Sequence, residues 1–518
     1  MMRKATFWLA VVLGAGLAVR VALALQPATT LLTKTMPDDA FYYFAIARNV
    51  ASGAGVSING IAPTNGFHPL WAAILSALFW LAPKGSAGIH LGLLAAALAD
   101  VLTAWLAYRC IREAGLGEWA GVIAAALYGL HPLVIMESQN GLETAVSTFA
   151  FALATLAFLR MMQSAPTVRR WAWFGAASAL AVLGRTDAIF LLLFLYGALL
   201  LRWKRQAVPG VFAAAGIFAV LMAPWIIWNL ATFGTVTQSS GVAIPYVLRE
   251  RAREALPAGA AALRIFLYLW PGAVKSTLVA AWLYGGFSTL AAFVGIALAR
   301  FYGREVLPKS ENLAFASLIL PVYAAMASLA AHIFYRCYPR SWYFVPLSFS
   351  LALIAGPLLQ RGLARLSERR GRRRTWATVF AVLLVMVSAV QGASAWAQGF
   401  YPWQAEFSKA AVWVREYVPV AQPVAAFNAG ILGFYGKRPV INLDGVTDAQ
   451  ALATLEGRLL LSYANWRGAS LLVDFSAYAQ GMYKPFLGEQ YELQPLLSLG
   501  APHPLYGSLT IYRIAGGE

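Results

Sequence analysis

Two adjacent carboxylates, Asp38 and Asp39, lie in the stretch MPDDAFYYFAIARNVASGAG, residues 36–55, directly after the first apolar run of the chain. They follow Pro37 and open a helical pattern, so one interpretation is that they only stabilise the start of a helix. Neighbouring side chains on a helix, however, diverge by about 100°. One carboxylate of the pair can therefore accept a proton from a reacting hydroxyl group while the other orients a loop, a cation or an arginine.

Other ionisable and aromatic residues interrupt apolar surroundings further along the chain. They are Glu137 and Glu143 in MESQNGLETA (136–145), Arg185 and Asp187 in GRTDAIF (184–190), Asn229, and Arg336, Arg340, Trp342 and Tyr343 in HIFYRCYPRSWYF (332–344). Structural interpretations exist for each: Glu143 can end a helix, and Arg185 can pair with Asp187. The arginines of the last stretch fit either an aromatic belt at a membrane surface or a binding site for a phosphate group.

The composition is that of a membrane protein with many spans. Of the 518 residues, 60% are hydrophobic and only 12% are charged, which excludes an ordinary soluble domain. Cys110 and Cys337 are far apart and match no ligand or redox spacing, so we expect neither a disulfide framework nor a zinc site. The net charge of +18 comes mostly from Lys and Arg in short loops, which indicates membrane topology rather than nucleic-acid binding.

Apolar runs long enough to cross about 30 Å of hydrocarbon predict about eleven transmembrane helices. They lie near residues 6–25, 87–108, 119–136, 143–162, 171–184, 188–201, 208–230, 276–299, 313–334, 342–360 and 375–395. The first run is either a cleaved signal peptide or an uncleaved anchor. We favour the anchor, because the run is long and no polar domain follows it.

The short apolar run 69–82 decides the topology. If it lies in the membrane interface instead of crossing, the arginine-rich loops, including 361–374, all fall on the cytoplasmic side. The N-terminus is then cytoplasmic, and the first loop (27–86) and everything after residue 396 lie outside. The polar residues above also fall on this outer face, where we expect them to form one site with His68 at its rim.

The last part of the chain, residues 397–518, has a different sequence pattern from the membrane module 1–396. Helical patterns at 406–417 and 447–466 alternate with strand patterns in PVAAF, RPVINLD, SLLVDF and LTIYRI. This alternation predicts a small α/β domain outside the membrane. Its turn NAGILGFYG (428–436) lacks the G-x-G-x-x-G spacing, so a dinucleotide site there has little support.

The run DDAFYYFAIARNVASGAGVSINGIAPTNGFHPLW (38–71) resembles the first outer loop of bacterial members of the GT-C superfamily of membrane glycosyltransferases. These enzymes use polyprenyl-phosphate sugars as donors, and they include protein O-mannosyltransferases, the aminoarabinose transferase acting on lipid A, and mycobacterial arabinosyltransferases. Four further segments also resemble segments of such proteins, namely NGLETA (140–145), GRTDAIF, RSWYF (340–344) and NLDG (442–445). The resemblance implies an α-helical polytopic fold with a C-terminal α/β domain, but it does not identify the sugar.

The resemblance also implies roles for single residues. Asp38 resembles the catalytic base, and Asp39 would position the acceptor, hold the loop or help bind a divalent cation, Mg or Mn, that only some members need. We expect Arg336 and Arg340 to stabilise the lipid phosphate, with Tyr343 nearby and Arg185 as an alternative. The remaining candidates for substrate contacts are Tyr42, Tyr43, Asn65, His68, Glu143 and Asp187.

The expected function is therefore inverting transfer of a single sugar from a polyprenyl-phosphate donor to a hydroxyl of a cell-envelope glycan, glycolipid or lipid-linked acceptor. The expected partners are that donor, the acceptor and the lipid bilayer, for a monomer in the bacterial cytoplasmic membrane with its site facing the periplasm or exterior. No WWD motif is present, which argues against transfer of whole glycans to Asn. The alternative is a transporter or flippase of lipid-linked sugars, which would also use many spans and charged residues in the membrane.

Overall fold

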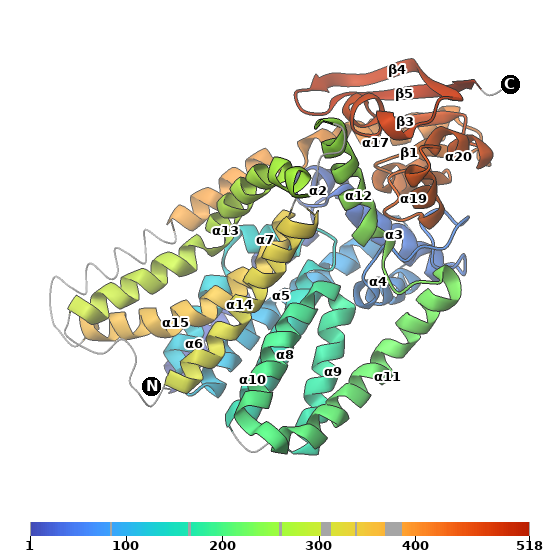
Figure 1. Cartoon of the computed structure of the whole chain (residues 1–518). Coiled ribbons are helices and arrows are strands. Elements are labelled where there is room, and N and C mark those ends of the chain that lie inside the picture. Colours follow the sequence, from blue (N-terminus) through green and yellow to red (C-terminus); the bar gives the residue numbers. More distant parts are fainter. Residues whose placement is uncertain are drawn as a thin grey trace.

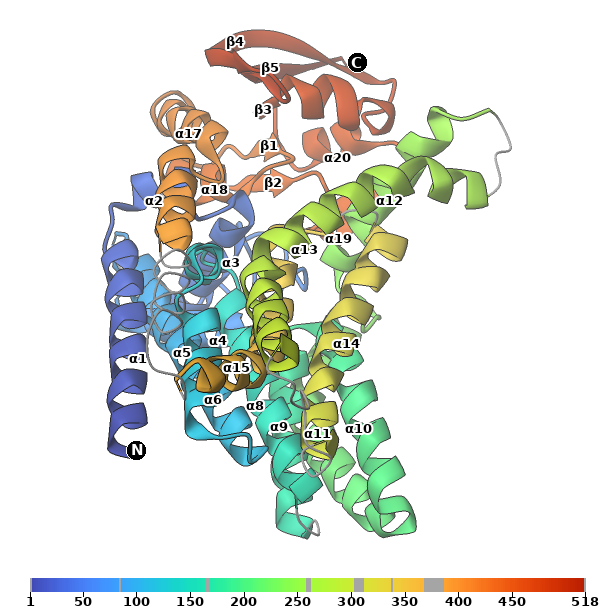
Figure 2. The same cartoon turned by 90° about the vertical axis from the view of Figure 1, so that its left-hand side faces the viewer.

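The computed structural model describes residues 2–82, 85–163, 167–257, 262–301, 312–336, 339–367 and 386–516. These residues form a bundle of long helices with a small sheet domain at one end, as Figure 1 shows. The predicted fold class, a helical membrane protein with a C-terminal α/β domain, is confirmed. Figure 2 shows that the sheet domain lies at the end of the bundle opposite the N-terminus.

The helices of the bundle include many of the predicted spans. They are α1 (Met2–Ala24), α5 (Ala87–Glu113), α6 (Glu118–Gly129), α7 (Pro132–Ser138), α8 (Thr144–Gln163), α9 (Val168–Gly184), α10 (Ile189–Trp203), α11 (Val208–Phe233), α13 (Ala262–Phe301), α14 (Asn312–Arg336) and α15 (Val345–Ser367). A further helix covers 386–398. The predicted span at 375–395 lies partly outside the described residues.

The predicted number of about eleven spans is not confirmed. In the described part of the chain, seven helices are long and apolar enough to cross a membrane, or eight if α6 and α7, which meet at 63°, form one broken span. One of the seven stretches, Thr186–Phe233, contains η1 (Thr186–Ala188), α10, the short turn η2 (Lys204–Ala207) and α11. Figure 1 shows that the chain reverses direction at η2, where Lys204 has a φ of 48°.

Small residues let the helices of the bundle approach closely. At Gly175 of α9, a Cβ atom would lie 2.3 Å from the carbonyl oxygen of Ala214 on α11, so only glycine fits there. Such close approach is the usual way in which membrane helices gain packing energy, because lipid gives little hydrophobic drive between them.

A buried ion pair ties α1 to the bundle. The Arg20 Nε donates to Asp100 Oδ2 at 2.8 Å, and the Arg20 Nη1 donates to the carbonyl oxygens of Gly16 and Gly129 at 3.0 and 2.8 Å. The Tyr128 hydroxyl donates to the other oxygen of Asp100. Arg20 and Asp100 are completely buried, so three helices share one closed set of polar contacts.

The first loop folds into three helices at the same end as the sheet domain, namely α2 (Ala28–Lys34), α3 (Asp38–Ala51) and α4 (Pro69–Leu81). Pro69 is suited to the first position of α4, since it has no N–H to leave unpaired. With 13 residues, α4 is too short to cross a membrane, and its position in the membrane interface stays a prediction. It buries Trp71, Ala72, Leu75 and Phe79 and leaves Trp80 exposed.

The C-terminal domain is built on a five-stranded sheet in the order β2-β1-β3-β5-β4. The strands are β1 (Val424–Ala426), β2 (Val440–Asn442), β3 (Leu471–Phe475), β4 (Tyr491–His503) and β5 (Gly507–Gly516). The first three strands are parallel, and β5 is antiparallel to both β3 and β4. Helices α17 (Ala405–Tyr417), α18 (Gly430–Gly436), α19 (Ala449–Glu456) and α20 (Leu460–Trp466) complete the domain.

The predicted elements of this domain are confirmed with two corrections. The helix predicted at 447–466 is two helices, α19 and α20, because the chain turns at Gly457 and at Arg458, whose φ is 56°. Strand β4 was not predicted, since Pro495 and Gly500 interrupt its pattern. Proline is tolerated there because β4 is an edge strand, where its missing N–H is not needed.

Candidate active site between the bundle and the C-terminal domain

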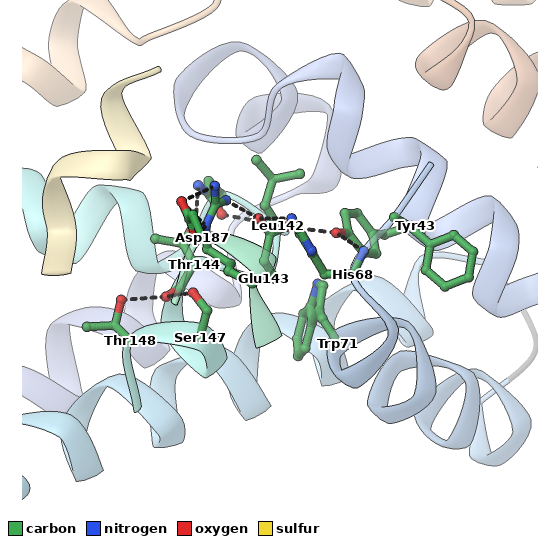
Figure 3. A network of polar contacts seen from close by, with 12 residues as sticks. Tyr43, His68, Trp71, Leu142, Glu143, Thr144, Ser147, Thr148 and Asp187 are labelled. Carbon is green, nitrogen blue, oxygen red and sulfur yellow. Dashed lines mark hydrogen bonds and ion pairs between the residues drawn. The ribbon is translucent and has the colours of Figure 1, made fainter. Parts of the chain in front are cut away.

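A network of polar contacts joins the first loop to the ends of α8 and α10 (Figure 3). The Tyr43 hydroxyl donates to Glu143 Oε2 at 2.9 Å and accepts the backbone N–H of His68 at 2.9 Å. The His68 Nε2 lies 3.7 Å from Glu143 Oε1. Burial alone would raise the pKa of Glu143, but the positive charges of His68 and Arg185 outweigh this effect and lower it. Glu143 is therefore held as a carboxylate.

Arg185 is the centre of this network. Its Nη1 contacts Glu143 Oε1, and its Nη2 contacts Asp187 Oδ2 at 3.0 Å. The guanidinium lies 4.4 Å from the centroid of the Tyr343 ring. The charge of Arg185 is thus balanced by two carboxylates, so the predicted pairing with Asp187 is present and Glu143 joins it. A cavity of about 30 Å³ beside these groups is large enough for a water molecule.

Two residues of α14 complete the network. The His332 Nε2 lies 3.0 Å from Asp187 Oδ2, and the Ser328 hydroxyl donates to the same oxygen at 3.3 Å. The His332 ring also stacks on Tyr343, with ring centroids 4.2 Å apart. Neither residue was predicted. His332 begins the stretch HIFYRCYPRSWYF, so its place in a predicted site segment was the available signal.

Asn65 lies apart from the Arg185 network and holds the first loop against α11 and α12 (Ser239–Glu254). Its Nδ2 donates to Asn229 Oδ1 at 2.8 Å, and its Oδ1 accepts the backbone N–H of Ser239 at 3.2 Å. Asn65 and Asn229 are both almost completely buried. Sequence analysis placed both at the same face, but it did not predict their contact.

Asp38 and Tyr42 contact the C-terminal domain. The two carboxylate oxygens of Asp38 accept the backbone N–H groups of Gly430 and Ile431 at 2.9 and 2.7 Å. Burial raises the pKa of Asp38 to about 7, although the two amide hydrogen bonds act against this rise. The Tyr42 hydroxyl accepts from the Ala429 N–H and from Asn442 Nδ2, each at 3.1 Å.

Asp39 is less buried than Asp38. Burial raises the pKa of Tyr401 and Tyr478, and the charges of Asp39 and Arg340 act on both phenols in opposite directions. The pKa of Asp444, in the predicted NLDG segment, is raised by burial and then by the charges of Asp39 and Asp38. Asp39 and Arg340 thus lie near the same aromatic groups, and Asp444 is a further carboxylate that sequence analysis did not single out.

Glu137 supports the segment that carries Arg340. It accepts hydrogen bonds from Tyr284 at 2.7 Å and from Asn140 at 3.1 Å, and it also bonds with the hydroxyl of Ser341. Ser341 begins η4 (Ser341–Phe344), directly after Arg340. Arg336 is the last residue of α14, but its side chain lies outside the described residues, as does Cys337.

The described residues contain no group of three or more His, Cys, Asp or Glu side chains that is arranged to hold a metal ion. A divalent cation at Asp39 stays a prediction from the resemblance.

Two family models match parts of the chain. The model described as dolichyl-phosphate-mannose-protein mannosyltransferase matches residues 67–228, which include His68, Glu143, Arg185 and Asp187 but not the Asp38–Asp39 pair. A model described as a domain of unknown function matches residues 396–506. Among curated proteins, none matches the chain in sequence.

Solved structures match almost the whole chain. The oligosaccharyltransferase of Archaeoglobus fulgidus is 15% identical, with a TM-score of 0.61, and the match covers 99% of this chain and 75% of that one. ArnT from Cupriavidus metallidurans bound to undecaprenyl phosphate is 15% identical, with a TM-score of 0.56 and 99% of both chains covered. The chain has the GT-C fold. The mycobacterial arabinofuranosyltransferase AftD shares this GT-C fold at 16% identity and a TM-score of 0.50, with 99% of this chain and 42% of that chain covered.

The GT-C fold accounts for the arrangement of the polar residues. The first loop, the start of α8, the start of α10 and the segment after α14 meet at one end of the bundle, beneath the C-terminal domain. The candidate site is therefore assembled from segments that are far apart in the sequence.

Proposed function

We propose that the chain is an inverting glycosyltransferase that transfers a single sugar from a polyprenyl-phosphate donor to a hydroxyl group of a cell-envelope glycan, glycolipid or lipid-linked acceptor. The observation that carries the proposal is the meeting of Asp39 and Arg340 near the same aromatic groups at the end of a GT-C bundle. A base for the acceptor and a cation for the leaving phosphate are the two groups that this reaction requires. The proposed location is the outer face of a bacterial cytoplasmic membrane.

The reaction needs little from the protein beyond these two groups. A carboxylate removes the proton of the acceptor hydroxyl, whose oxygen attacks the anomeric carbon from the side opposite the phosphate. The bond between that carbon and the phosphate oxygen breaks, and the phosphate leaves with the electron pair. Phosphate is a good leaving group, so no strong acid is required, but its negative charge needs stabilisation.

Arg340 is better suited than Arg185 to bind the phosphate. Arg185 is buried, which limits the approach of a phosphate group. Arg340 is exposed at the start of η4, where its guanidinium can approach a ligand. A lipid phosphate also fits the related structures, since one of them holds dolichol-phosphate and another holds undecaprenyl phosphate.

An apolar cavity supports a lipid-linked donor. It has a volume of about 720 Å³ and lies between α1, α6, α7, α13, α15 and the helix 386–398. Its lining residues include Leu23, Leu127, Ile135, Phe287, Leu359 and Trp396. Ile135 is two residues from Glu137, which bonds with Ser341 next to Arg340. We propose that an isoprenoid chain lies in this cavity with its phosphate end toward Arg340.

The proposal is tested with purified protein in lipid vesicles and a panel of polyprenyl-phosphate sugars carrying mannose, arabinose or aminoarabinose. We expect one of them to yield a glycosylated acceptor and Arg340→Ala to weaken donor binding about tenfold to a hundredfold. Arg513→Ala, at an exposed arginine of β5, is the matched control and should leave the donor dissociation constant unchanged. An unaltered constant for Arg340→Ala would reject the phosphate role of Arg340.

The second candidate, a flippase for lipid-linked sugars, rests on the charged residues inside the bundle. The same vesicles distinguish the two functions. If labelled donor lipid crosses the bilayer and no panel member gives a glycosylated product, the flippase replaces the transferase.

A further inference from the structure

The carboxyl ends of the three parallel strands of the C-terminal domain meet at one edge of its sheet. The strands β1, β2 and β3 all run toward this edge. Because β5 is antiparallel to β3 and pairs Leu509 with Phe475, the turn between β4 and β5 lies at the same edge. In open α/β sheets, ligands bind outside the carboxyl ends of the strands. We call the residues at these ends the carboxyl edge, which comprises 427–430, 443–446, 476–478 and 503–507.

The carboxyl edge lies against the first loop and the start of α12. Asp38 accepts two backbone N–H groups of the segment that follows β1. A Cβ atom at Gly66 would lie 2.0 Å from the carbonyl oxygen of Val446, so the first loop also contacts the turn after β2 closely. The Ser239 hydroxyl donates to the same carbonyl oxygen at 2.7 Å. The edge of the domain that is best suited to bind a ligand is therefore held against the candidate active site.

Three rings of the carboxyl edge form a row. Tyr478 lies in η6 (Ala477–Met482), directly after β3, and Tyr506 and His503 come from the turn between β4 and β5. The ring of Tyr506 lies at 13° to that of Tyr478 and at 21° to that of His503, with centroids 5.9 and 4.9 Å apart. Rings at these separations overlap only in part, and all three side chains are partly exposed. We call these three residues the aromatic row.

Buried rings of the same domain show what a purely structural stack is like. Phe427 and Tyr483 stack at 9° with centroids 4.1 Å apart, and they are only 1 and 2% exposed. The aromatic row is more open in both respects. The face of an aromatic ring is electron-rich and attracts the C–H groups of a sugar ring, so a row of partly open rings suits a carbohydrate chain.

Asp444 adds a carboxylate to the carboxyl edge. It follows β2 and is partly exposed, and its Oδ1 accepts the N–H of Val446 at 2.8 Å, which fixes the side chain in the turn. Burial raises the pKa of Tyr483, and the charge of Asp444 raises it further, so Asp444 lies near this ring. The ring of Tyr483 is 6.4 Å from that of Tyr478. Carboxylate oxygens accept more than one hydrogen bond, so Asp444 can also accept from hydroxyl groups of a ligand near the aromatic row.

The aromatic row begins near the proposed phosphate site. The charge of Arg340 acts to lower the pKa of Tyr478, against the larger effect of burial. From Tyr478 the row continues through Tyr506 to His503 at the end of β4. A chain of sugars along the row would thus have one end in the region where the donor phosphate is proposed to bind.

We propose that the carboxyl edge of the C-terminal domain binds a carbohydrate chain and that this chain is the acceptor. In this assignment, which rests on the proposed glycosyl transfer, Asp444 accepts hydroxyl groups of the sugar that reacts, and the aromatic row stacks on the sugars that follow it. The match to a domain of unknown function, residues 396–506, includes Asp444 and the whole row. The acceptor is then an oligosaccharide or polysaccharide, held by several of its sugars.

Binding is tested first without any donor, by calorimetry of the full-length protein in nanodiscs. The probes are tetrasaccharides of mannose, arabinose, galactose and N-acetylglucosamine, together with the four monosaccharides. We expect at least one tetrasaccharide to bind and its monosaccharide to bind at least about tenfold more weakly, because most contacts with the aromatic row are lost. Binding of no tetrasaccharide would overturn the carbohydrate site.

Variants then locate the bound chain. Tyr506→Leu and Asp444→Ala should each raise the dissociation constant of the tetrasaccharide about tenfold, through loss of a ring face and of a hydrogen-bond acceptor. The matched controls are Tyr491→Leu and Glu492→Ala at the start of β4, which lies at the opposite edge of the sheet. They should leave the constant unchanged. If Asp444→Ala does not fold, Tyr478→Leu takes its place, and wild-type binding by the folded variants of the carboxyl edge would overturn the proposal.

Kinetics with the donor identified above connect this site to the reaction. We expect Tyr506→Leu to raise the KM for the acceptor about tenfold, with a smaller change in kcat and none in the KM for the donor, a split that a general folding defect would not give. If a tetrasaccharide binds at the carboxyl edge but the protein transfers no sugar, the proposed function fails while the carbohydrate site stands. If sugar is transferred to an acceptor and no tetrasaccharide binds, the transferase stands and the carbohydrate site falls.

Discussion

Two arginines are buried with carboxylate partners in this molecule, and their surroundings differ. Arg20, in α1, contacts Asp100 and two carbonyl oxygens, and Tyr128 occupies the remaining oxygen of Asp100. We call these three residues the Arg20 cluster. Arg185 contacts two carboxylates from different segments, lies over an aromatic ring and borders a small cavity.

The comparison shows that burial of charge in a membrane protein does not by itself mark a functional site. The Arg20 cluster is closed, because its partners come only from α1, α5 and α6 and both charged side chains have no exposed surface. The Arg185 network reaches from the first loop to α14, and its members keep 5 to 19% of their side-chain surface. We infer that the Arg20 cluster holds helices together and that the Arg185 network holds the segments of the candidate site in register.

The largest effect expected from this comparison is on stability. Asp100→Ala leaves Arg20 buried without its partner, and loss of one member of such a pair costs about 3–5 kcal/mol of unfolding free energy. Denaturant unfolding of the purified protein in detergent would measure the loss. Sugar transfer per folded molecule should stay close to the wild-type value.

Two controls show whether the cost comes from the unpaired charge. The double variant Arg20→Met with Asp100→Leu removes both charges and should recover most of the lost stability. Thr155→Val, at a buried residue whose hydroxyl donates to the carbonyl of Phe151 one turn earlier, should change stability by less than about 1 kcal/mol. A loss of unfolding free energy below about 1 kcal/mol for Asp100→Ala would show that the Arg20 cluster does not hold these helices together.

Sequence analysis predicted the face on which the site forms better than the contacts within it. Charges in the short loops placed Glu143, Arg185 and Asp187 at one face, and the structure brings these three together. The partners of Asp38 were not predictable in this way. They are backbone N–H groups 392 and 393 residues further along the chain, and backbone donors leave no signal in residue type.

The number of spans could also not be predicted from the sequence pattern. Apolar runs indicate that a segment is buried in lipid or protein, but they do not show where it bends. The predicted span at 119–136 includes the break between α6 and α7. The two predicted spans at 188–201 and 208–230, by contrast, correspond to α10 and α11 on either side of η2. Tertiary packing decides such breaks, so a hydropathy pattern alone overestimates how regular the bundle is.

Compared with the Arg20 cluster, we expect changes in the Arg185 network to have a smaller effect on stability and a larger effect on activity. Arg185→Lys keeps one positive charge but loses the fork that reaches both Glu143 and Asp187. We expect kcat/KM to fall about a hundredfold, since displacement of catalytic segments by about 1 Å has effects of that size. Arg112→Lys, at an exposed pair with Glu118, is the matched control and should change neither activity nor stability measurably. Equal activity of the two variants would assign the Arg185 network to structure alone, like the Arg20 cluster.

The smallest effect is expected at the edge of the Arg185 network. Tyr43→Phe removes the hydroxyl that donates to Glu143 and accepts the N–H of His68, while the ring stays packed against Phe67. Glu143 keeps Arg185 and His68 as partners, so we expect a loss of only about 1 kcal/mol, seen as a fewfold drop in kcat/KM. Tyr417→Phe, at an exposed tyrosine of α17, should show no drop. A drop for Tyr43→Phe as large as that for Arg185→Lys would mean that the Tyr43 hydroxyl contacts the substrate directly, and the comparison would then place Tyr43 within the reacting site.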